Sequence, residues 1–393
     1  MTRWPVATYT MTSALGGGVQ AHEQALRVGR SGLRLQRFET AHFEAWLGLV
    51  DGVDDVAMPE GLQDFDCRNN RLAWLGLQAD GFLARVQQAV RRYGAHRVGV
   101  FMGTSTSGIL QTEQAYRARD PQTGALPSSL HYPETHNTGS LSRFVQAALG
   151  LSGPAWSVST ACSSGAKAFG NAERLLSLGL IDAAVVGGVD SLCLTTLYGF
   201  NSLELVSPDI CRPWDAGRRG LSLGEAAAFA LLERDADRPV AWLRGVGESS
   251  DGHHMSSPLP DGSGAAMAMR QALERGGVDA NEVGYVNLHG TATPNNDAAE
   301  DQAMQAVFPH VPCSSTKGAT GHTLGAAGAL EAGFAMVALQ TGYLPGGSTL
   351  LQPDPALKSH YLREGRDAAP RLVASNSFGF GGTNTCLLFE AAA

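Results

Sequence analysis

The sequence predicts an α/β protein with layered sheets, and three observations support this. Short apolar runs rich in β-branched residues alternate with Ala- and Leu-rich helical patterns, as is typical of sheets covered by helices. Of the 393 residues, 44% are hydrophobic and 17% are charged, so the chain has enough apolar material for a large core and too little charge for a disordered protein. At about 150 residues per domain, this length suggests two to three domains.

The expected elements follow from apolar runs bounded by Gly, Pro or polar residues. Strands are expected at 97–103, 155–160, 182–190, 226–233, 283–290 and 372–379. Helices are expected at 163–178, 264–275, 296–307 and 321–340. A strand, a Ser/Gly/Thr turn and a Gly/Ala-rich helix occur in WSVSTACSSGAKAFGNAERLLSLG and again in VPCSSTKGATGHTLGAAGALEAG, which suggests duplicated halves. With a charged, Pro- and Gly-containing boundary near 235–250, the halves are predicted at 1–240 and 241–393.

Charge and hydropathy exclude several classes of function. The net charge of −8 argues against general nucleic-acid binding. The sequence contains no run of about 18 or more apolar residues, the length that would be needed to span a membrane. The N-terminus lacks the charged segment followed by an apolar segment that is typical of a signal peptide. The six cysteines form no CxxC pair and have no His at zinc spacing. We therefore expect a cytoplasmic protein with reduced thiols, no metal site, and no nucleic-acid or membrane partner.

Charge is unevenly distributed in the first hundred residues. Residues 38–67 carry eight acids and no Lys or Arg, whereas 68–97 carry six arginines and only one acid, Asp80. Such a basic stretch could dock an acidic partner. A solvated helix face is an equally good interpretation.

Cys162 is the first candidate for chemistry. It follows a strand that ends at Thr160 and precedes a helix expected to begin near Ser163 and to stop at Gly179. On such a turn a thiol meets unpaired N–H groups and the positive end of the helix dipole, which favour the thiolate. A buried structural Cys is the alternative, but a strand–elbow–helix context is typical of nucleophiles. The other five cysteines are expected to be small core residues.

Three further segments carry groups suited to catalysis. His289 follows an apolar strand, where α/β proteins often place ligand contacts. His322 begins a Gly/Ala helix five residues after Lys317, one of only three lysines in the chain. The segment NSFGFGGTN (376–384) is a Gly-rich turn between strands, and its N–H groups suit an oxyanion better than a phosphate.

Taken together, TACSSG, HGTATPNND, STKGATGHTLGAAGALE and NSFGFGGTN closely resemble the β-ketoacyl-acyl-carrier-protein synthases, the elongating Cys-His-His condensing enzymes of the thiolase-like superfamily. CRPWDAGRRGLSLGEAAAFALLE (211–233) and SSDGHHMSSPLPDGSGAAMAMRQAL (249–273) are similar to that family too. The resemblance runs from about residue 97 to 390 and is loose before that. It implies a thiolase-like five-layered αβαβα fold of two duplicated halves, and a homodimer or a heterodimer with a related subunit.

The resemblance also implies roles for individual residues. Cys162 would be the acyl-accepting nucleophile, and His289 and His322 would act in malonyl decarboxylation. The N–H groups of Cys162 and Phe380 would hold the oxyanion, and Lys317 and Glu331 would support the histidines. Thr291 and Thr293 would contact pantetheine, Thr106 and Phe378 would contact the substrate, and Arg68 and Arg71 would dock the carrier protein. A structural monovalent cation would bind at Asn287, Glu331, Ser375 and Asn376. Acyl- and malonyl-acyl carrier protein would be the partners, and no redox or organic cofactor would be needed.

Two departures from the family pattern suggest a specialised substrate. Glu204 stands where many relatives carry a basic residue for the carrier protein, which shifts the expected docking to Arg68 and Arg71. The stretch 131–142 and Thr106, expected near the acyl pocket, are polar, whereas a saturated chain would favour an apolar lining. Polyene or polyketide chain building is therefore an alternative to primary fatty acid synthesis.

Other classes of function fit less well. A degradative thiolase would need a second active-site Cys in a CxG setting, but Cys386 lies within an expected strand. A non-catalytic chain-length partner subunit would normally lack the nucleophile that Cys162 supplies. A Cys-His hydrolase would leave the second histidine and Lys317 unexplained.

Overall fold

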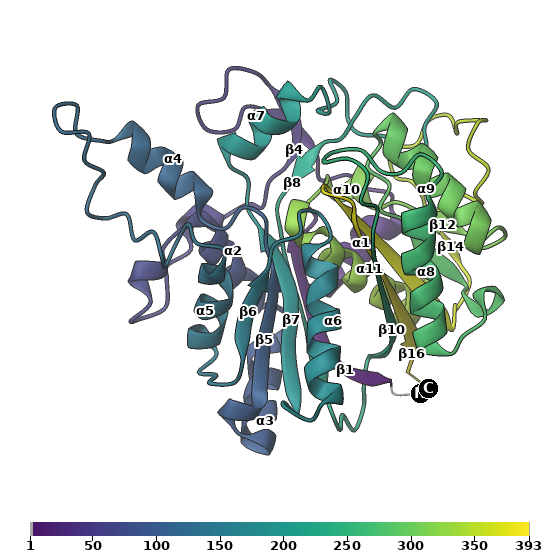
Figure 1. Cartoon of the computed structure of the whole chain (residues 1–393), viewed down its shortest axis with the longest axis horizontal. Helices are drawn as coiled ribbons and strands as arrows, with labels where there is room; N and C mark the ends of the chain where they lie inside the picture. The colour runs from purple at the N-terminus through teal and green to yellow at the C-terminus, as the bar shows by residue number, and fades with distance from the viewer. Residues whose placement is uncertain (1–2, 393) are drawn as a thin grey trace.

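A computed structural model describes residues 3–392 (Figure 1). Its main feature is an 11-stranded sheet in the order β12-β11-β15-β16-β10-β1-β9-β7-β5-β6, with the short β2 (Gly16–Gly17) attached to β1. The N-terminal half of the chain supplies β1 (Trp4–Ser13), β5 (Val98–Gly103), β6 (Ala155–Val158), β7 (Ala183–Asp190) and β9 (Ala226–Glu233). The C-terminal half supplies β10 (Ala241–Ser250), β11 (Tyr285–Asn287), β12 (Cys313–Ser314), β15 (Leu372–Gly379) and β16 (Thr383–Ala391).

The two halves of this sheet have the same topology. From the outer edge inward, each half places its third, second, fourth, fifth and first strand in that order. In each half the two outer pairings are parallel and the two inner ones antiparallel. The halves meet where β1 pairs with β10. The duplication expected from the repeated strand–turn–helix pattern is therefore confirmed.

Helices cover both faces of each half, giving five layers. α2 (Arg68–Leu77), α3 (Phe82–Tyr93) and α5 (Gly139–Ala148) pack on the outer face of the N-terminal half. α6 (Ser164–Ser177) and α11 (Ala327–Thr341) pack together between the halves, and α8 (Ser263–Gly276) and α9 (Pro294–Val307) form the opposite outer layer. Figure 1 shows this order from left to right, with α6 between the two sets of strands. The expected αβαβα layering is confirmed.

Smaller elements surround these layers. They are α1 (Val19–Arg27), α4 (Ile109–Arg117), α7 (Leu194–Ser202), α10 (Lys317–Thr320), β3 (Arg34–Gln36), β4 (Ala45–Gly48), β8 (Leu223–Gly224), β13 (Tyr343–Leu344) and β14 (Arg366–Asp367). α4 and the connection that follows it extend away from the body of the protein (Figure 1).

The two central helices approach closely because small residues face each other. A Cβ at Gly165 of α6 would lie 2.9 Å from the backbone of Gly325 and Ala329, and one at Gly328 of α11 would lie 2.7 Å from Ala166. Only glycine fits such contacts. The Gly/Ala-rich composition of both helices thus brings together the two turns that precede them.

Two expected elements differ from the structure. The helix expected at 321–340 is a 3-10 turn at Leu324–Ala326 followed by α11, and the chain is not helical before that turn because Gly321 and Leu324 have φ of 74° and 55°. The strand expected at 283–290 covers only Tyr285–Asn287, and the N–H groups of His289 and Gly290 donate to the Glu300 carboxylate instead of a neighbouring strand. The stretch Leu324–Thr341 is long and apolar enough to cross a membrane, contrary to the sequence expectation, but 89% of it is buried inside the fold. It is a core helix.

Candidate active site

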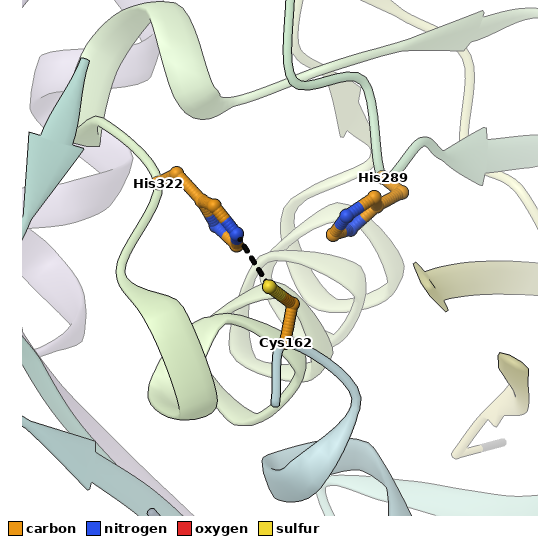
Figure 2. A group of neighbouring side chains, drawn as sticks. All are labelled: Cys162, His289 and His322. Carbon is orange, nitrogen blue, oxygen red and sulfur yellow. Dashed lines mark hydrogen bonds between the residues drawn. The ribbon is translucent and has the colours of Figure 1, made fainter. Parts of the chain in front are cut away.

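Cys162 lies on a tight turn between β6 and α6. Ala161, immediately before it, has a φ of 51°, a conformation that non-glycine residues rarely adopt and that is common at active sites. The Ser164 hydroxyl donates to the Ala161 carbonyl at 2.6 Å and closes the turn. The Cys162 side chain consequently points toward two imidazole rings, those of His289 and His322 (Figure 2).

His322 approaches Cys162 from the break between α10 and α11. Its N–H donates to the Ser222 carbonyl at 2.7 Å, and its carbonyl accepts the Gly224 N–H at 3.0 Å. These two hydrogen bonds hold the backbone of His322 in place and so fix where its ring begins. The Nε2 atom lies 2.9 Å from the Cys162 sulfur, as the dashed line in Figure 2 marks.

His289 faces the same sulfur from the end of β11. The ligating atoms of Cys162, His289 and His322 all lie within 4.8 Å of one another. Lys317 Nζ lies 3.4 Å from His289 Nδ1, and it also donates to the His289 carbonyl and to the Glu331 carboxylate. A charged amine can only donate, so Nδ1 is the acceptor and the ring proton is on Nε2. Lys317 therefore leaves His289 with an N–H donor on the nitrogen that faces away from the lysine.

Burial governs the protonation of these groups. It raises the pKa of Cys162 to about 12, although the charge of Lys317 and the N–H of Phe380 act in the opposite direction. Burial and Lys317 lower the pKa of both histidines well below 6.5. At neutral pH the resting site holds a thiol, which donates to His322 Nε2, and two neutral imidazoles. The expectation that the turn favours a thiolate is wrong for this state, because the loss of hydration outweighs the neighbouring charges.

The hairpin between β15 and β16 closes the opposite side of the site. Gly381 and Gly382 have φ of 83° and 78°, so this turn requires glycine at both positions. The backbone N–H of Phe380 lowers the pKa of the Cys162 thiol. The Gly-rich turn thus presents a backbone donor beside the candidate nucleophile.

A pocket of about 340 Å³ opens over these groups. Thr291 and Thr293 line it, with their hydroxyl oxygens 2.9 Å apart. Phe378 packs on the ring of His289, and Phe200 packs on that of Phe380. Further lining residues include Leu203, Leu205, Leu221, Asp251, Ser256, Asn295, Asn296 and Asn384. The sulfur and both imidazoles therefore lie at the surface of a pocket whose other walls are partly apolar.

Comparisons with known proteins decide the family. The model described as "Beta-ketoacyl synthase, N-terminal domain" matches residues 11–238, and that described as "Beta-ketoacyl synthase, C-terminal domain" matches 240–350. The chain belongs to the β-ketoacyl synthase family. Its 3-oxoacyl-[acyl-carrier-protein] synthase 2 relative from Vibrio cholerae is 32% identical over 97% of each chain.

Solved β-ketoacyl synthases have the same fold. A chain of the ketosynthase ApeO in complex with its chain length factor ApeC, from Xenorhabdus doucetiae, has a TM-score of 0.90 and 38% identity, covering 99% of this chain and 98% of that one. A β-ketoacyl synthase from Burkholderia phymatum has a TM-score of 0.87 and 30% identity over the whole of both chains. The chain is accordingly a condensing acyltransferase, and its convergent Cys-His-His group agrees with that chemistry.

Most of the site residues expected from the sequence converge around this pocket. Those that line it or lie directly behind it are Cys162, His289, His322, Thr291, Thr293, Phe378, Phe380, Lys317 and Glu331. Three expected residues, Arg68, Arg71 and Thr106, do not join them.

Arg68 and Arg71 are not arranged as docking residues. Arg68 is 6% exposed, and its guanidinium donates to both oxygens of the buried Glu225 at 2.7 and 2.8 Å and to Asp54. Arg71 is partly exposed but donates to both oxygens of Asp66. The expectation that Arg68 offers a free positive charge for docking is wrong, because Glu225 and Asp54 pair with its guanidinium inside the fold. The charge of Arg71 is likewise paired, with Asp66.

Replacing Arg68 with methionine should therefore lower stability and leave the KM for a carrier protein without a specific change. Glu225 would remain buried without its ion pair, and breaking a buried pair costs about 3–5 kcal/mol. Urea denaturation measures this loss. The matched replacement Arg91→Met removes an exposed arginine on α3 and should change stability by less than about 0.5 kcal/mol. An unchanged stability of Arg68→Met with a raised KM would restore the docking role.

Thr106 does not line the pocket above Cys162. It is 1% exposed, and its hydroxyl donates to Asp190 at 2.8 Å. The expected contact of Thr106 with substrate therefore stays a prediction, and in this structure the polar group of Thr106 is bonded to a buried carboxylate.

Sequence reasoning missed Glu300, which holds the backbone behind His289. Its buried carboxylate accepts the N–H of His289 at 2.8 Å, the N–H of Gly290 at 2.7 Å and the amide of Asn376 at 3.1 Å. Burial raises the pKa of Glu300 to about 7. The only signal in the sequence is an acid one helix turn after Asp297, which looks the same as a surface acid.

Proposed function

We propose that this chain is the catalytic subunit of a ketosynthase that condenses an acyl group carried on Cys162 with malonyl-acyl carrier protein, with loss of CO2. The observation that carries the proposal is the 2.9 Å contact between Cys162 Sγ and His322 Nε2, with His289 beside it. A non-catalytic chain-length subunit is not favoured, because the thiol and both imidazoles are present together.

In the first half-reaction, the acyl group moves from the carrier thioester to Cys162. His322 Nε2 accepts the thiol proton, and the sulfur attacks the thioester carbonyl. The N–H groups of Cys162 and Phe380 hold the tetrahedral oxyanion. When the carrier thiolate leaves, it takes the proton back from His322, so that the histidine is again neutral.

In the second half-reaction, malonyl-acyl carrier protein loses CO2 and leaves an enolate. The N–H of His289 Nε2 stabilises the enolate oxygen, and His322 supplies a second N–H once its ring proton has moved through solvent from Nδ1 to Nε2. The carbanion attacks the Cys162 thioester, and the released thiolate takes a proton from solvent. Lys317 holds His289 in the tautomer that donates, and Glu331 balances the lysine charge.

The rest of the pocket suits a thioester arm. The hydroxyls of Thr291 and Thr293 would bind the amides of pantetheine, and Phe378 would cover the thioester beside His289. An acyl carrier protein would deliver both substrates, as the names of the relatives suggest.

We further propose a specialised polyene or polyketide pathway. The chain is 38% identical to a chain of the ApeO–ApeC complex and 32% identical to the Vibrio cholerae synthase, and it also aligns with the ishigamide ketosynthase/chain length factor at a TM-score of 0.89 and 27% identity. The polar stretch 131–142 supports the same proposal: His136 bonds Thr112 at 2.8 Å and stacks on Tyr132.

A second chain of the same fold, either a copy or a related subunit, is the proposed partner. β6 is the last strand of the sheet, and Trp156 on it is 38% exposed. A bare sheet edge with an exposed aromatic residue favours pairing with another strand. The cytoplasm is the proposed location, since all six cysteines are free thiols, as in a reducing compartment.

A structural monovalent cation is proposed between β11, β15 and α11. Four buried side-chain oxygens have no hydrogen-bond partner among the described residues: Asn287 Oδ1, Glu331 Oε2, Ser375 Oγ and Asn376 Oδ1. Oxygen atoms of this kind suit a hard cation, which would supply positive charge beside Glu331. Replacing N-methylglucamine with K⁺ or Na⁺ at constant ionic strength should raise Tm by about 2 °C or more. Ser375→Ala should reduce this response, and an equal Tm in all three salts would contradict the site.

Mass spectrometry of acyl groups on Cys162 tests the function and its substrate class. The chain, alone and with a candidate partner subunit, is incubated with saturated, polyenoyl and polyketide acyl carrier proteins, followed by malonyl-acyl carrier protein. We expect an adduct on Cys162 that is largest with an unsaturated or oxygenated chain and that is discharged as an extended product. Adducts that form but never extend would contradict the catalytic assignment, and preference for a saturated chain would contradict the pathway.

A further inference from the structure

Asp190 is a buried acid that the reaction steps above do not use. It is the last residue of β7 and is fully buried. In the described part of the chain, its carboxylate accepts hydrogen bonds from hydroxyl and backbone N–H groups and pairs with no basic side chain. A buried carboxylate is destabilising unless such donors compensate it, so their arrangement is informative.

The donors come from two segments far apart in the sequence. Asp190 Oδ1 accepts the hydroxyl of Thr104 at 2.6 Å and the N–H and hydroxyl of Thr106 at 3.0 and 2.8 Å. Oδ2 accepts the Ser105 hydroxyl at 2.5 Å and the Gly325 N–H at 2.6 Å. The Ser105 N–H lies 2.9 Å from both oxygens. Asp190 thus joins the loop after β5 to the 3-10 turn that precedes α11.

The segment that Asp190 holds also carries His322. Gly325 follows His322 by three residues, and Leu324 between them has a φ of 55°. A Cβ at Gly325 would lie 2.7 Å from Asp190 Oδ2 and 2.7 Å from the Ser105 N, so the contact requires glycine. The same turn packs against Gly165, three residues after Cys162. The carboxylate therefore fixes the backbone on the side of His322 that faces the nucleophile turn.

We propose that Asp190 is a positioning residue, which keeps His322 in contact with Cys162 by clamping Gly325 to the 104–106 loop. This role rests on the condensing chemistry of the chain. It also accounts for the first three of the four successive hydroxyl residues at 104–107, which follow an apolar strand.

The charge of Asp190 acts against the nucleophile, which separates positioning from activation. The negative charges of Asp190 and Glu331 raise the pKa of Cys162, whereas Lys317 lowers it. The other groups that face the sulfur are the imidazoles of His289 and His322. If Asp190 served only the thiol, its removal would help the reaction. A positioning role predicts that the variant has a more reactive thiol and slower condensation.

Asp190→Asn is the direct test. The amide nitrogen would have to face a backbone N–H in either orientation, since Ser105 and Thr106 donate to one side and Ser105 and Gly325 to the other. We expect CO2 release from malonyl-acyl carrier protein to fall roughly 10- to 100-fold, as for a displaced catalytic group. The rate at which iodoacetamide alkylates Cys162 at pH 7.5 should stay equal or rise. Asp190→Glu keeps the charge and should leave that alkylation rate near the parent value.

Ser105→Ala provides a second variant with a smaller change in the fold. It removes a donor to Oδ2, and Ser107→Ala is its matched control, because the Ser107 hydroxyl donates to Thr135 and Asn137 carbonyls instead. Ser105→Ala should slow CO2 release more than Ser107→Ala does.

The proposal is overturned if Asp190→Asn and Ser105→Ala both release CO2 at the parent rate. It is also overturned if Asp190→Asn is inactive only through unfolding, seen as alkylation of all six cysteines, while Ser105→Ala is fully active. A parent enzyme that releases no CO2 would instead contradict the proposed function.

Discussion

Replacing Cys162 with serine should abolish condensation, with a loss of more than about 10³-fold in rate. The sulfur lies 2.9 Å from His322 Nε2, the nitrogen that accepts its proton in the proposed mechanism. Burial raises the pKa of the thiol to about 12, and a serine hydroxyl is a weaker acid still and a weaker nucleophile at neutral pH. The measurement is transfer of a labelled acyl group to the protein and the yield of extended product.

The control for this prediction is Cys193→Ser, which changes a buried cysteine outside the pocket. Cys193 caps α7, and its sulfur lies 3.3 Å from the Thr196 hydroxyl, a contact that serine can also make. That variant should condense at nearly the parent rate. If Cys162→Ser still forms an acyl-enzyme that extends, the nucleophile is another residue.

Iodoacetamide mapping checks the same assignment without mutation. Burial raises the pKa of all six cysteines, so acidity does not distinguish them. Access does, because Cys162 is the one of the six that lines the pocket above the histidines. We expect Cys162 to be alkylated well before the others. Equal labelling of all six would argue against an accessible nucleophile.

Local sequence patterns were sufficient for much of the fold. The strands expected at 226–233 and 372–379 have those bounds in the structure, and α6 lies within one residue of its expected limits at each end. Such segments are predictable because an apolar run bounded by polar residues or glycine has few alternatives. The turn at Cys162 was predictable for the same reason, since a strand, a small-residue turn and a helix occur consecutively.

What could not be predicted depends on residues far apart in the chain. Nothing near Arg68 indicates that Glu225, 157 positions later, takes up its charge. Nothing near Thr106 indicates its bond to Asp190, 84 positions later. The direction of the Cys162 pKa was mispredicted because dipole and turn effects are local, whereas desolvation depends on how the whole fold covers the sulfur.

The second large effect is expected for the histidines. His289→Ala or His322→Ala should slow CO2 release from malonyl-acyl carrier protein by on the order of 10² to 10³, the typical loss for one positioned donor. Both rings have pKa values well below 6.5, so each is neutral at pH 7 and offers a single N–H to the enolate oxygen. Acylation of Cys162 should persist in His289→Ala, which keeps the sulfur, the backbone N–H groups and His322, and should fall in His322→Ala, which removes the acceptor of the thiol proton. The paired measurement is labelled acyl transfer and labelled CO2 release.

Lys317→Ala distinguishes the two rings. Lys317 touches His289 Nδ1 and sets its tautomer, while in the described structure His322 Nδ1 has no hydrogen-bond partner. Removing the ammonium also removes a charge that lowers both histidine pKa values, so protonation should begin at a higher pH. The variant should therefore release CO2 more slowly than the parent, with a milder defect than His289→Ala. The rate at which the variant acylates Cys162 should decline as the pH falls toward 6, because a protonated His322 cannot accept the Cys162 proton. If both His289→Ala and His322→Ala release CO2 at the parent rate, these rings do not stabilise the enolate, and the decarboxylation step must be assigned to other donors in the pocket.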